Sequence, residues 1–197
     1  MQTAILVIII AAAVFAVFYF SPRSIGGRII ESPRFGILNL KGEEAAALIS
    51  NDASAIASVL GQPQQSTTAV PQCDVLFVYC DMEPEGGVRN CRDGLREIIR
   101  DSGASVVVVA SENDGEAYVA SGKRDTNKKY GRANLVMTLQ RNGEVFPSFF
   151  ARLFADMKQG VPMPVAWVKL APQVPGHDQA DCPGTIFSCE AGQVAFR

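Results

Sequence analysis

The chain has 197 residues, of which 48% are hydrophobic and 19% are charged, and its formal net charge is −2. This length allows one domain with a sizeable core but not two full ones, and the apolar content excludes intrinsic disorder. With 18 basic against 20 acidic side chains, the chain is not a generally basic nucleic-acid-binding protein, and we expect no nucleic-acid partner.

The N-terminal segment is apolar and uncharged. No charged side chain precedes Arg23, and residues 5–20 read ILVIIIAAAVFAVFYF before Pro22. About 20 helical residues cross the hydrocarbon core of a bilayer. We therefore expect residues 1–22 to form a transmembrane helix, with the lipid bilayer as its partner. The alternatives are a cleaved signal peptide and a buried core helix. A signal peptide normally begins with a positively charged n-region, and a core helix normally carries a polar stripe.

The residues that follow this span indicate its orientation. Four of them are basic and only one is acidic: Arg23, Arg28, Glu31, Arg34 and Lys41. The positive-inside rule places such a flank in the cytoplasm. We therefore expect a single-pass membrane protein in which residues 23–34 form a juxtamembrane tether and residues 35–197 form a cytoplasmic domain.

The cysteines agree with a cytoplasmic domain. There are five: Cys73, Cys80, Cys91, Cys182 and Cys189. An odd number does not indicate a disulfide framework, and no spacing is CxxC, so a structural zinc site is not expected either. We expect no cofactor.

The first part of the domain predicts a strand, a helix and a loop. Residues 35–40 (FGILNL) are typical of a strand, and residues 42–60 carry apolar side chains at mostly helical spacing. Asn51-Asp52 could divide this helix, because aspartate is a favourable N-cap residue. Residues 61–71 are polar and contain two prolines, which predicts a loop.

Three continuous apolar runs predict strands that are buried on both faces. They are residues 74–80 (DVLFVYC), 104–110 (ASVVVVA) and 134–139 (NLVMTL). A loop over residues 81–90 and an amphipathic helix over residues 91–101 separate the first two runs. Residues 111–132 form a long polar connection, and we expect its basic end to be a solvated loop.

The C-terminal part contains a second amphipathic helix and two shorter patterns. The helix covers residues 147–159, with Pro147 at its first position and Gly160 after its end. Residues 165–171 (VAWVKLA) are ambiguous between helix and strand. Residues 185–196 contain two apolar runs, broken at Ala191-Gly192, which predict a terminal hairpin or strand.

The order of these elements predicts an α/β fold, with a mainly parallel sheet flanked by helices.

Right-handed crossovers would bring the loops that follow the first two buried strands, residues 81–87 and 111–116, to the same edge of the sheet. That carboxyl edge is where α/β folds bind ligands. The candidate ligand-binding residues are Asp81, Glu83, Glu85, Gly86, Gly87, Glu112, Asn113 and Asp114. Their carboxylates suit a divalent cation, but the spacing matches no metal motif, so no metal ligand is assigned.

Three residues are candidates for nucleophilic chemistry. Cys80 ends a predicted strand, but its acidic neighbours would raise the pKa of its thiol. Ser111 would need a base, and none stands near it in the sequence. His177 is the only histidine and lies in the Pro- and Gly-rich segment APQVPGHDQADCPG. No catalytic pair is recognisable, so enzymatic activity is not expected.

Residues 74–196 resemble the CHAT branch of the caspase-like cysteine peptidases. The segment ASVVVVASENDG resembles the strand that carries the family's cysteine, commonly followed by S-A-C-E-T-G, with Ser111 at the cysteine position. The segment DVLFVYCDM resembles the preceding strand, with Cys80 and Asp81 where the family has His-Gly. RANLVMTL and FPSFFARLFADMKQGVPMPVAWVKLA resemble the next strand and the long helices, which favours a helix over residues 165–171. The closing TIFSCEAGQVAF resembles the last strand.

A second register places Cys80 at the nucleophile position, with CDMEPEGG similar to C-E-T-G, and leaves no upstream histidine. Both registers lose the His-Cys pair. The resemblance therefore implies a caspase-like three-layer fold without peptidase activity, serving as a binding or scaffolding module for a cytoplasmic protein partner. A thiol enzyme that uses Cys80 remains an alternative, as does a module that binds a small ligand or divalent metal at the acidic loops.

Overall fold

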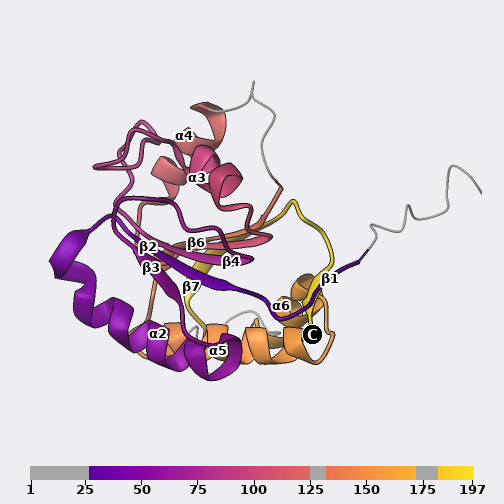
Figure 1. Cartoon of the computed structure of the whole chain (residues 1–197). Helices are drawn as coiled ribbons and strands as arrows, with labels where there is room; N and C mark the ends of the chain where they lie inside the picture. The colour runs from indigo at the N-terminus through magenta and orange to yellow at the C-terminus, as the bar shows by residue number, and fades with distance from the viewer. Residues whose placement is uncertain (1–26, 125–131, 172–181) are drawn as a thin grey trace, which may run out of the picture.

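The computed structural model describes residues 27–124, 132–171 and 182–197. Its main feature is a six-stranded sheet in the order β3-β2-β4-β5-β6-β7 (Figure 1). The strands are β2 (Phe35–Asn39), β3 (Gln64–Ser66), β4 (Val75–Tyr79), β5 (Val106–Val109), β6 (Asn134–Gln140) and β7 (Gly184–Cys189). All neighbours run parallel except β7, which is antiparallel to β6. The predicted α/β fold with a mainly parallel sheet is confirmed.

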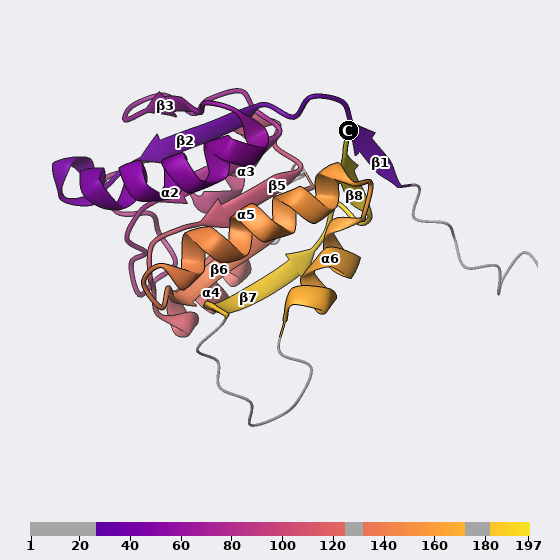
Figure 2. The same ribbon diagram turned by 90° about the horizontal axis from the view of Figure 1, so that it is seen from below.

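Helices cover both faces of this sheet (Figures 1 and 2). One face carries α2 (Ala46–Leu60), α5 (Val145–Lys158) and α6 (Met163–Leu170), and the other carries α3 (Leu95–Ser102) and α4 (Gly115–Arg124). Each face buries its own hydrophobic cluster. The chain therefore forms three layers, with the sheet in the middle.

The two central strands, β4 and β5, are buried along their whole length, as their continuous apolar sequences predict. On the α5 face, the ring of Phe77 packs edge-on against Phe150, with 5.4 Å between ring centroids. On the opposite face, Val78 and Val107 belong to the cluster that includes Ile98 of α3. Buried on both sides, these strands hold the loops that follow them in fixed positions.

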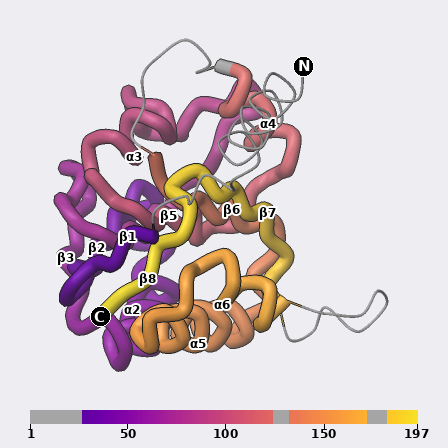
Figure 3. Tube along the Cα trace, turned by 90° about the vertical axis from the view of Figure 1, so that its right-hand side faces the viewer, coloured from indigo at the N-terminus to yellow at the C-terminus, as the bar shows by residue number. Residues whose placement is uncertain are grey.

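A second, two-stranded sheet lies at the amino edge of the main sheet, where the parallel strands begin (Figure 3). It pairs β1 (Arg28–Ile30) in parallel with β8 (Val194–Phe196). The guanidinium of Arg28 donates a 2.7 Å hydrogen bond to the hydroxyl of Ser105, just before β5. Part of the segment expected to be a tether is thus a strand, and the two C-terminal runs join different sheets instead of forming a hairpin.

Several element boundaries differ from the expectation in the first half of the chain. A 3₁₀ turn, η1 (Gly42–Ala45), leads into α2, which runs without a break at Asn51-Asp52. Asp52 does not cap a helix, because its carboxylate is buried against Tyr79 and Arg141. The segment expected to be a loop contains the polar edge strand β3, and the expected helix over residues 91–101 begins only at Leu95.

The second half of the chain shows three further outcomes. The long polar connection contains α4, which buries Ala117, Tyr118 and Ser121 against the rest of the domain. Helix α5 begins at Val145, so Pro147 occupies its third position instead of its first. The ambiguous residues 165–171 are helical over most of their length, within α6.

The segment predicted to cross the membrane, residues 1–22, lies outside the described residues. Within the described ranges, no helix combines the length and the apolar character that crossing a bilayer requires.

Candidate functional site

The carboxyl edge of the parallel strands carries an open cavity of about 430 Å³. Its walls come from segments that follow three different strands. Lys41 follows β2, Ser111 and Glu112 follow β5, and Arg141 follows β6. The remaining lining residues are Glu44, Ala45 and Leu48, from η1 and the start of α2. Because parallel strands end at the same edge, residues distant in sequence meet here.

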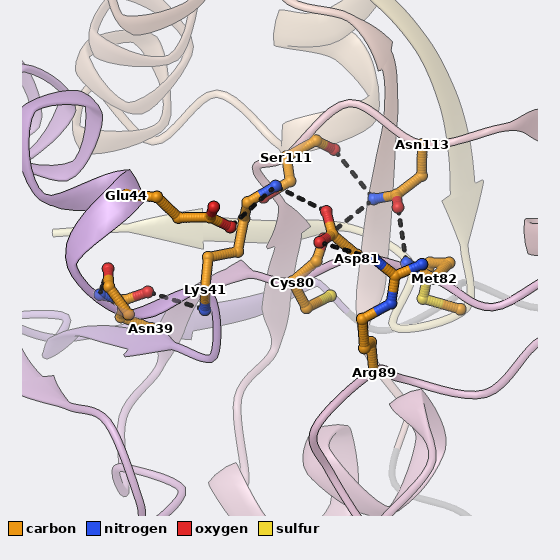
Figure 4. Close-up of polar contacts among 10 residues, drawn as sticks. Asn39, Lys41, Glu44, Cys80, Asp81, Met82, Arg89, Ser111 and Asn113 are labelled. Atoms are coloured by element: carbon orange, nitrogen blue, oxygen red, sulfur yellow. Dashed lines mark hydrogen bonds and ion pairs between the residues drawn. The ribbon is translucent and has the colours of Figure 1, made fainter.

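The ammonium of Lys41 is one of the two cationic groups in the lining of this cavity, and its contacts are drawn in Figure 4. It lies 2.6 Å from a carboxylate oxygen of Asp81 and 3.8 Å from one of Glu44. The other oxygen of Asp81 lies 3.5 Å from the guanidinium of Arg89. Asp81, a predicted ligand residue, is thus already neutralised by two cations.

The hydroxyl of Ser111 is the second polar group at the cavity. The side chain is buried, and its oxygen has no hydrogen-bond partner within the part of the chain that the structure describes. A buried polar group left without a partner costs free energy. A ligand group that reached this hydroxyl would remove that cost, because Ser111 lines the cavity.

The thiol of Cys80 lies just beyond β4, at the same edge, and is fully buried. Burial, and to a smaller extent the neighbouring Asp81, raise the pKa of this thiol to about 12. The sequence-based expectation of a raised pKa named the acidic neighbours as the cause, whereas burial is the larger effect. Such a thiol stays protonated at neutral pH.

Arg141, which lines the cavity, belongs to a buried ionic network with Asp52 and Tyr79. One guanidinium nitrogen of Arg141 contacts both carboxylate oxygens of Asp52, at 2.7 and 2.8 Å, and the other donates to the carbonyl of Ala110 at 2.5 Å. The hydroxyl of Tyr79 donates to Asp52 at 2.6 Å. Burial raises the pKa of Asp52, while the bonds from Arg141 and Tyr79 oppose that shift. These contacts fix the ends of β4, β5 and β6 relative to α2.

Asn113 connects the two predicted acidic loops. Its side-chain oxygen accepts the backbone N–H of Met82 at 2.7 Å (Figure 4). Its side-chain nitrogen donates to the backbone carbonyls of Cys80 and Ser111, both at 3.2 Å. The two loops therefore meet at one edge of the sheet. The side-chain amide of Asn113 holds them together through these hydrogen bonds.

Among the other predicted ligand residues, Glu112 lines this cavity, and its carboxylate accepts the backbone N–H of Arg141 at 2.7 Å. The lining does not include Glu83, Glu85, Gly86, Gly87 or Asp114. Asp114 accepts the N–H of Glu116 at the start of α4. Residues 83–87 form a turn that packs on α4, and there Gly86 has a φ of +81°. Glu83 and Gly87 line a separate cavity with residues 90–94.

The metal-binding alternative gains no support from this arrangement. Within the described ranges, no three or more His, Cys, Asp or Glu side chains are grouped so that they could hold a metal ion. His177, the third catalytic candidate, lies outside the described residues.

Five of the seven residues that line the cavity were not found from the sequence: Lys41, Glu44, Ala45, Leu48 and Arg141. Two of them carried a usable signal, because Lys41 follows β2 and Arg141 follows β6 within two residues of the strand ends. The rule that pointed to the loops after β4 and β5 applies equally to these flanking strands. Leu48 carried no such signal.

Comparisons with protein-family models, with curated proteins and with solved structures found no match to this chain.

Proposed function

We propose that this chain is a single-pass membrane protein whose cytoplasmic, caspase/CHAT-like domain binds a ligand or a protein partner at the carboxyl-edge cavity without catalysis. The anchor is argued from the uncharged residues 1–22. The family likeness is argued from the sequence segments around β4 and β5, and a mainly parallel sheet flanked by helices is compatible with it. In the first register, Ser111 occupies the nucleophile position, and Cys80-Asp81 occupies the His-Gly position.

The proposal that the domain binds without catalysis rests mainly on the burial and the raised pKa of the Cys80 thiol. This thiol is fully buried, and burial raises its pKa to about 12, so the thiol is protonated at neutral pH. Thiol enzymes use cysteines whose pKa is lowered by a nearby cation or helix terminus. The environment of Cys80 acts in the opposite direction, which argues against a thiol enzyme that uses this residue.

Ser111 is no better placed as a nucleophile. A seryl hydroxyl needs a base that accepts its proton. Two basic side chains line the cavity with it: Arg141, which is paired with Asp52, and Lys41, whose ammonium lies 2.6 Å from a carboxylate oxygen of Asp81. An ion-paired ammonium has no lone pair to accept a proton, so Lys41 is suited to binding.

Alkylation of the native full-length chain tests whether the Cys80 thiol is buried and unreactive. The protein, kept in detergent micelles, is treated with iodoacetamide at neutral pH, and each cysteine is followed by mass spectrometry. We expect the exposed Cys189 to react first and Cys80 to react only after denaturation. A Cys189→Ser variant removes the fast site and serves as the control. Selective modification of Cys80 in the native protein would overturn the proposal.

The lining of the cavity suits a small polar ligand or a side chain of a partner. Lys41 offers a positive charge, Glu44 and Glu112 offer negative charges, and Ala45 with Leu48 provides an apolar wall. Ligand sites commonly combine an apolar lining with a few placed polar groups. The hydroxyl of Ser111, which has no hydrogen-bond partner in the described ranges, supplies one more group that a ligand could bond.

Thermal unfolding tests binding with defined probes: acetate, inorganic phosphate, methylammonium and glycine. We expect at least one probe to raise the Tm of the wild-type chain, because ligands that bind only the folded state stabilise it. A Leu48→Trp variant, which fills the cavity, should lose that shift. A Val119→Trp variant, altered at an exposed position on α4, should keep it. If no probe shifts the wild-type Tm, or if both variants retain the shift, the cavity is not the site.

A further inference from the structure

We propose that the amino edge of the sheet, with β1 and α6, lies against an anionic lipid surface, so that the carboxyl-edge cavity faces away from the bilayer. This inference rests on the proposed anchor. The surface concerned is the one that carries β1, β8 and α6, and it is turned toward the viewer in Figure 3. We call it the amino-edge surface.

The position of β1 limits how far this surface can be from the membrane. The predicted span ends at residue 22, and β1 begins at Arg28, so residues 23–27 are the only link between them. Five residues in a fully extended conformation reach about 17 Å. Strand β1 is fixed to the domain by its pairing with β8 and by the bond from Arg28 to Ser105. An anchored domain must therefore hold its amino edge close to the bilayer.

The elements at this end expose apolar side chains. Ile29 on β1 is 51% exposed, and on α6 Val165 is 46% exposed and Val168 is 61% exposed. Val165 and Val168 are three residues apart, and the exposed Lys169 follows, so the three share one side of α6. The opposite side of α6 buries Met163 and Ala166 in the core. A helix with an apolar and cationic outer side is suited to a lipid interface.

The charge of this end is complementary to anionic lipid. Arg28, Lys169 and Arg197 are exposed there. Among the described residues, the acidic side chain that pairs with one of them is Glu31, whose carboxylate lies 3.8 Å from the guanidinium of Arg197. Lys41, which the sequence groups with the cations after the span, lies instead at the opposite edge, against Asp81. Each cation close to an anionic bilayer shifts the equilibrium toward the surface about fivefold.

The single tryptophan of the chain, Trp167, provides a direct reporter of this contact. It lies on α6 between Val165 and Val168, and its ring stacks on that of Phe187 at 4.8 Å. The full chain is reconstituted into phosphatidylcholine vesicles with or without phosphatidylserine, each containing a lipid with a nitroxide headgroup. We expect a loss of Trp167 emission in the phosphatidylserine vesicles, and recovery of the emission when the salt concentration is raised.

Two charge variants make the test specific. Val165→Glu together with Lys169→Glu should restore most of the emission, whereas Val119→Glu, on an exposed position of α4 on the other face of the sheet, should leave the quenching unchanged. Vesicle flotation distinguishes a failure of the proposed anchor from a failure of the proposed surface contact. A chain that does not float with the vesicles contradicts the anchor, and this inference with it. A chain that floats but keeps full Trp167 emission contradicts this inference alone.

Discussion

Arg141 and Asp52 form an ion pair that has almost no contact with water, with 8% of the Arg141 side chain exposed and none of the Asp52 side chain. Arg141 also lies over the ring of Phe146, with its central carbon 3.7 Å from the ring centroid. Removing one partner of a buried pair leaves the other charge without compensation. Breaking this pair should therefore destabilise the protein more than breaking an ion pair on the surface.

We expect Asp52→Asn and Arg141→Met each to lower the free energy of unfolding by about 3–5 kcal/mol. Urea denaturation followed by circular dichroism measures this change. The control is Arg197→Gln, which removes a highly exposed side chain whose acidic partner is 3.8 Å away and should change the stability little. A loss as small as that of the control would contradict the assigned network.

The buried thiols make stability depend on pH in the alkaline range. Burial raises the pKa values of Cys73 and Cys80 from 9.0 to about 12. Between these values the unfolded chain has lost the two protons and the folded chain keeps them, so the folded state binds more protons. The free energy of unfolding must then fall as the pH rises above about 9.

Urea denaturation at a series of pH values above neutrality measures this slope. The double variant Cys73→Ala, Cys80→Ala should be less stable at neutral pH, because it leaves cavities, but should show a shallower alkaline slope. Equal slopes for the variant and the wild-type chain would show that these thiols ionise in the folded state as they do in the unfolded one.

At the scale of elements, the loop after β4 is held against α4 at one glycine. Gly86 has a φ of +81°, and a Cβ added there would lie 2.1 Å from the backbone nitrogen of Ser121. Only glycine fits both the backbone conformation and the close approach. This contact keeps residues 83–87 on α4 and away from the cavity.

We expect Gly86→Ala to destabilise the protein by about 1–3 kcal/mol, because it introduces both a strained conformation and a clash with backbone atoms. The matched control is Gly122→Ala, in α4, where a Cβ meets no atom within 4 Å. That change should instead raise the stability by about 0.5–1 kcal/mol, because alanine favours the helix. Thermal unfolding of both variants measures the two opposite changes in stability. A Gly86→Ala variant as stable as the wild-type chain would contradict the close approach.

The sequence was informative about elements whose own residues carry the pattern. Strands β4 and β5 were predicted because a strand buried on both faces needs apolar side chains throughout. Strand β3 was not predicted, because its residues, Gln64–Ser66, are polar and it joins the sheet only at an edge. Helix α4 was not predicted, because its sequence GEAYVASGKR contains two glycines and only a narrow buried side.

The site was predicted only in part for a related reason. Position in the chain located the loops after β4 and β5, but the partners of their polar groups come from distant segments. Asp81 was predicted as a ligand residue, whereas Lys41 and Arg89 neutralise it. Asp52 was expected to cap a helix, whereas Arg141 draws it into the interior. Contacts over such sequence separations follow from the packing of the sheet and not from any local pattern.

At the scale of the whole molecule, the two edges of the sheet have different characters. The amino edge carries β1, the exposed valines of α6 and several cations, and it receives the chain from the predicted membrane span. The carboxyl edge carries a cavity with charges of both signs and a buried hydroxyl that has no hydrogen-bond partner among the described residues. The proposed arrangement places lipid at the first edge and a ligand or partner at the second.

The central claim is that the carboxyl edge binds without turnover. The most direct measurement incubates the purified full-length chain with a complex mixture of peptides and follows new peptide termini by mass spectrometry, alongside Cys80→Ala and Ser111→Ala variants. The account predicts no cleavage by the wild-type chain beyond that seen with either variant. Cleavage by the wild-type chain that either substitution abolishes, while the folded structure is retained, would contradict it.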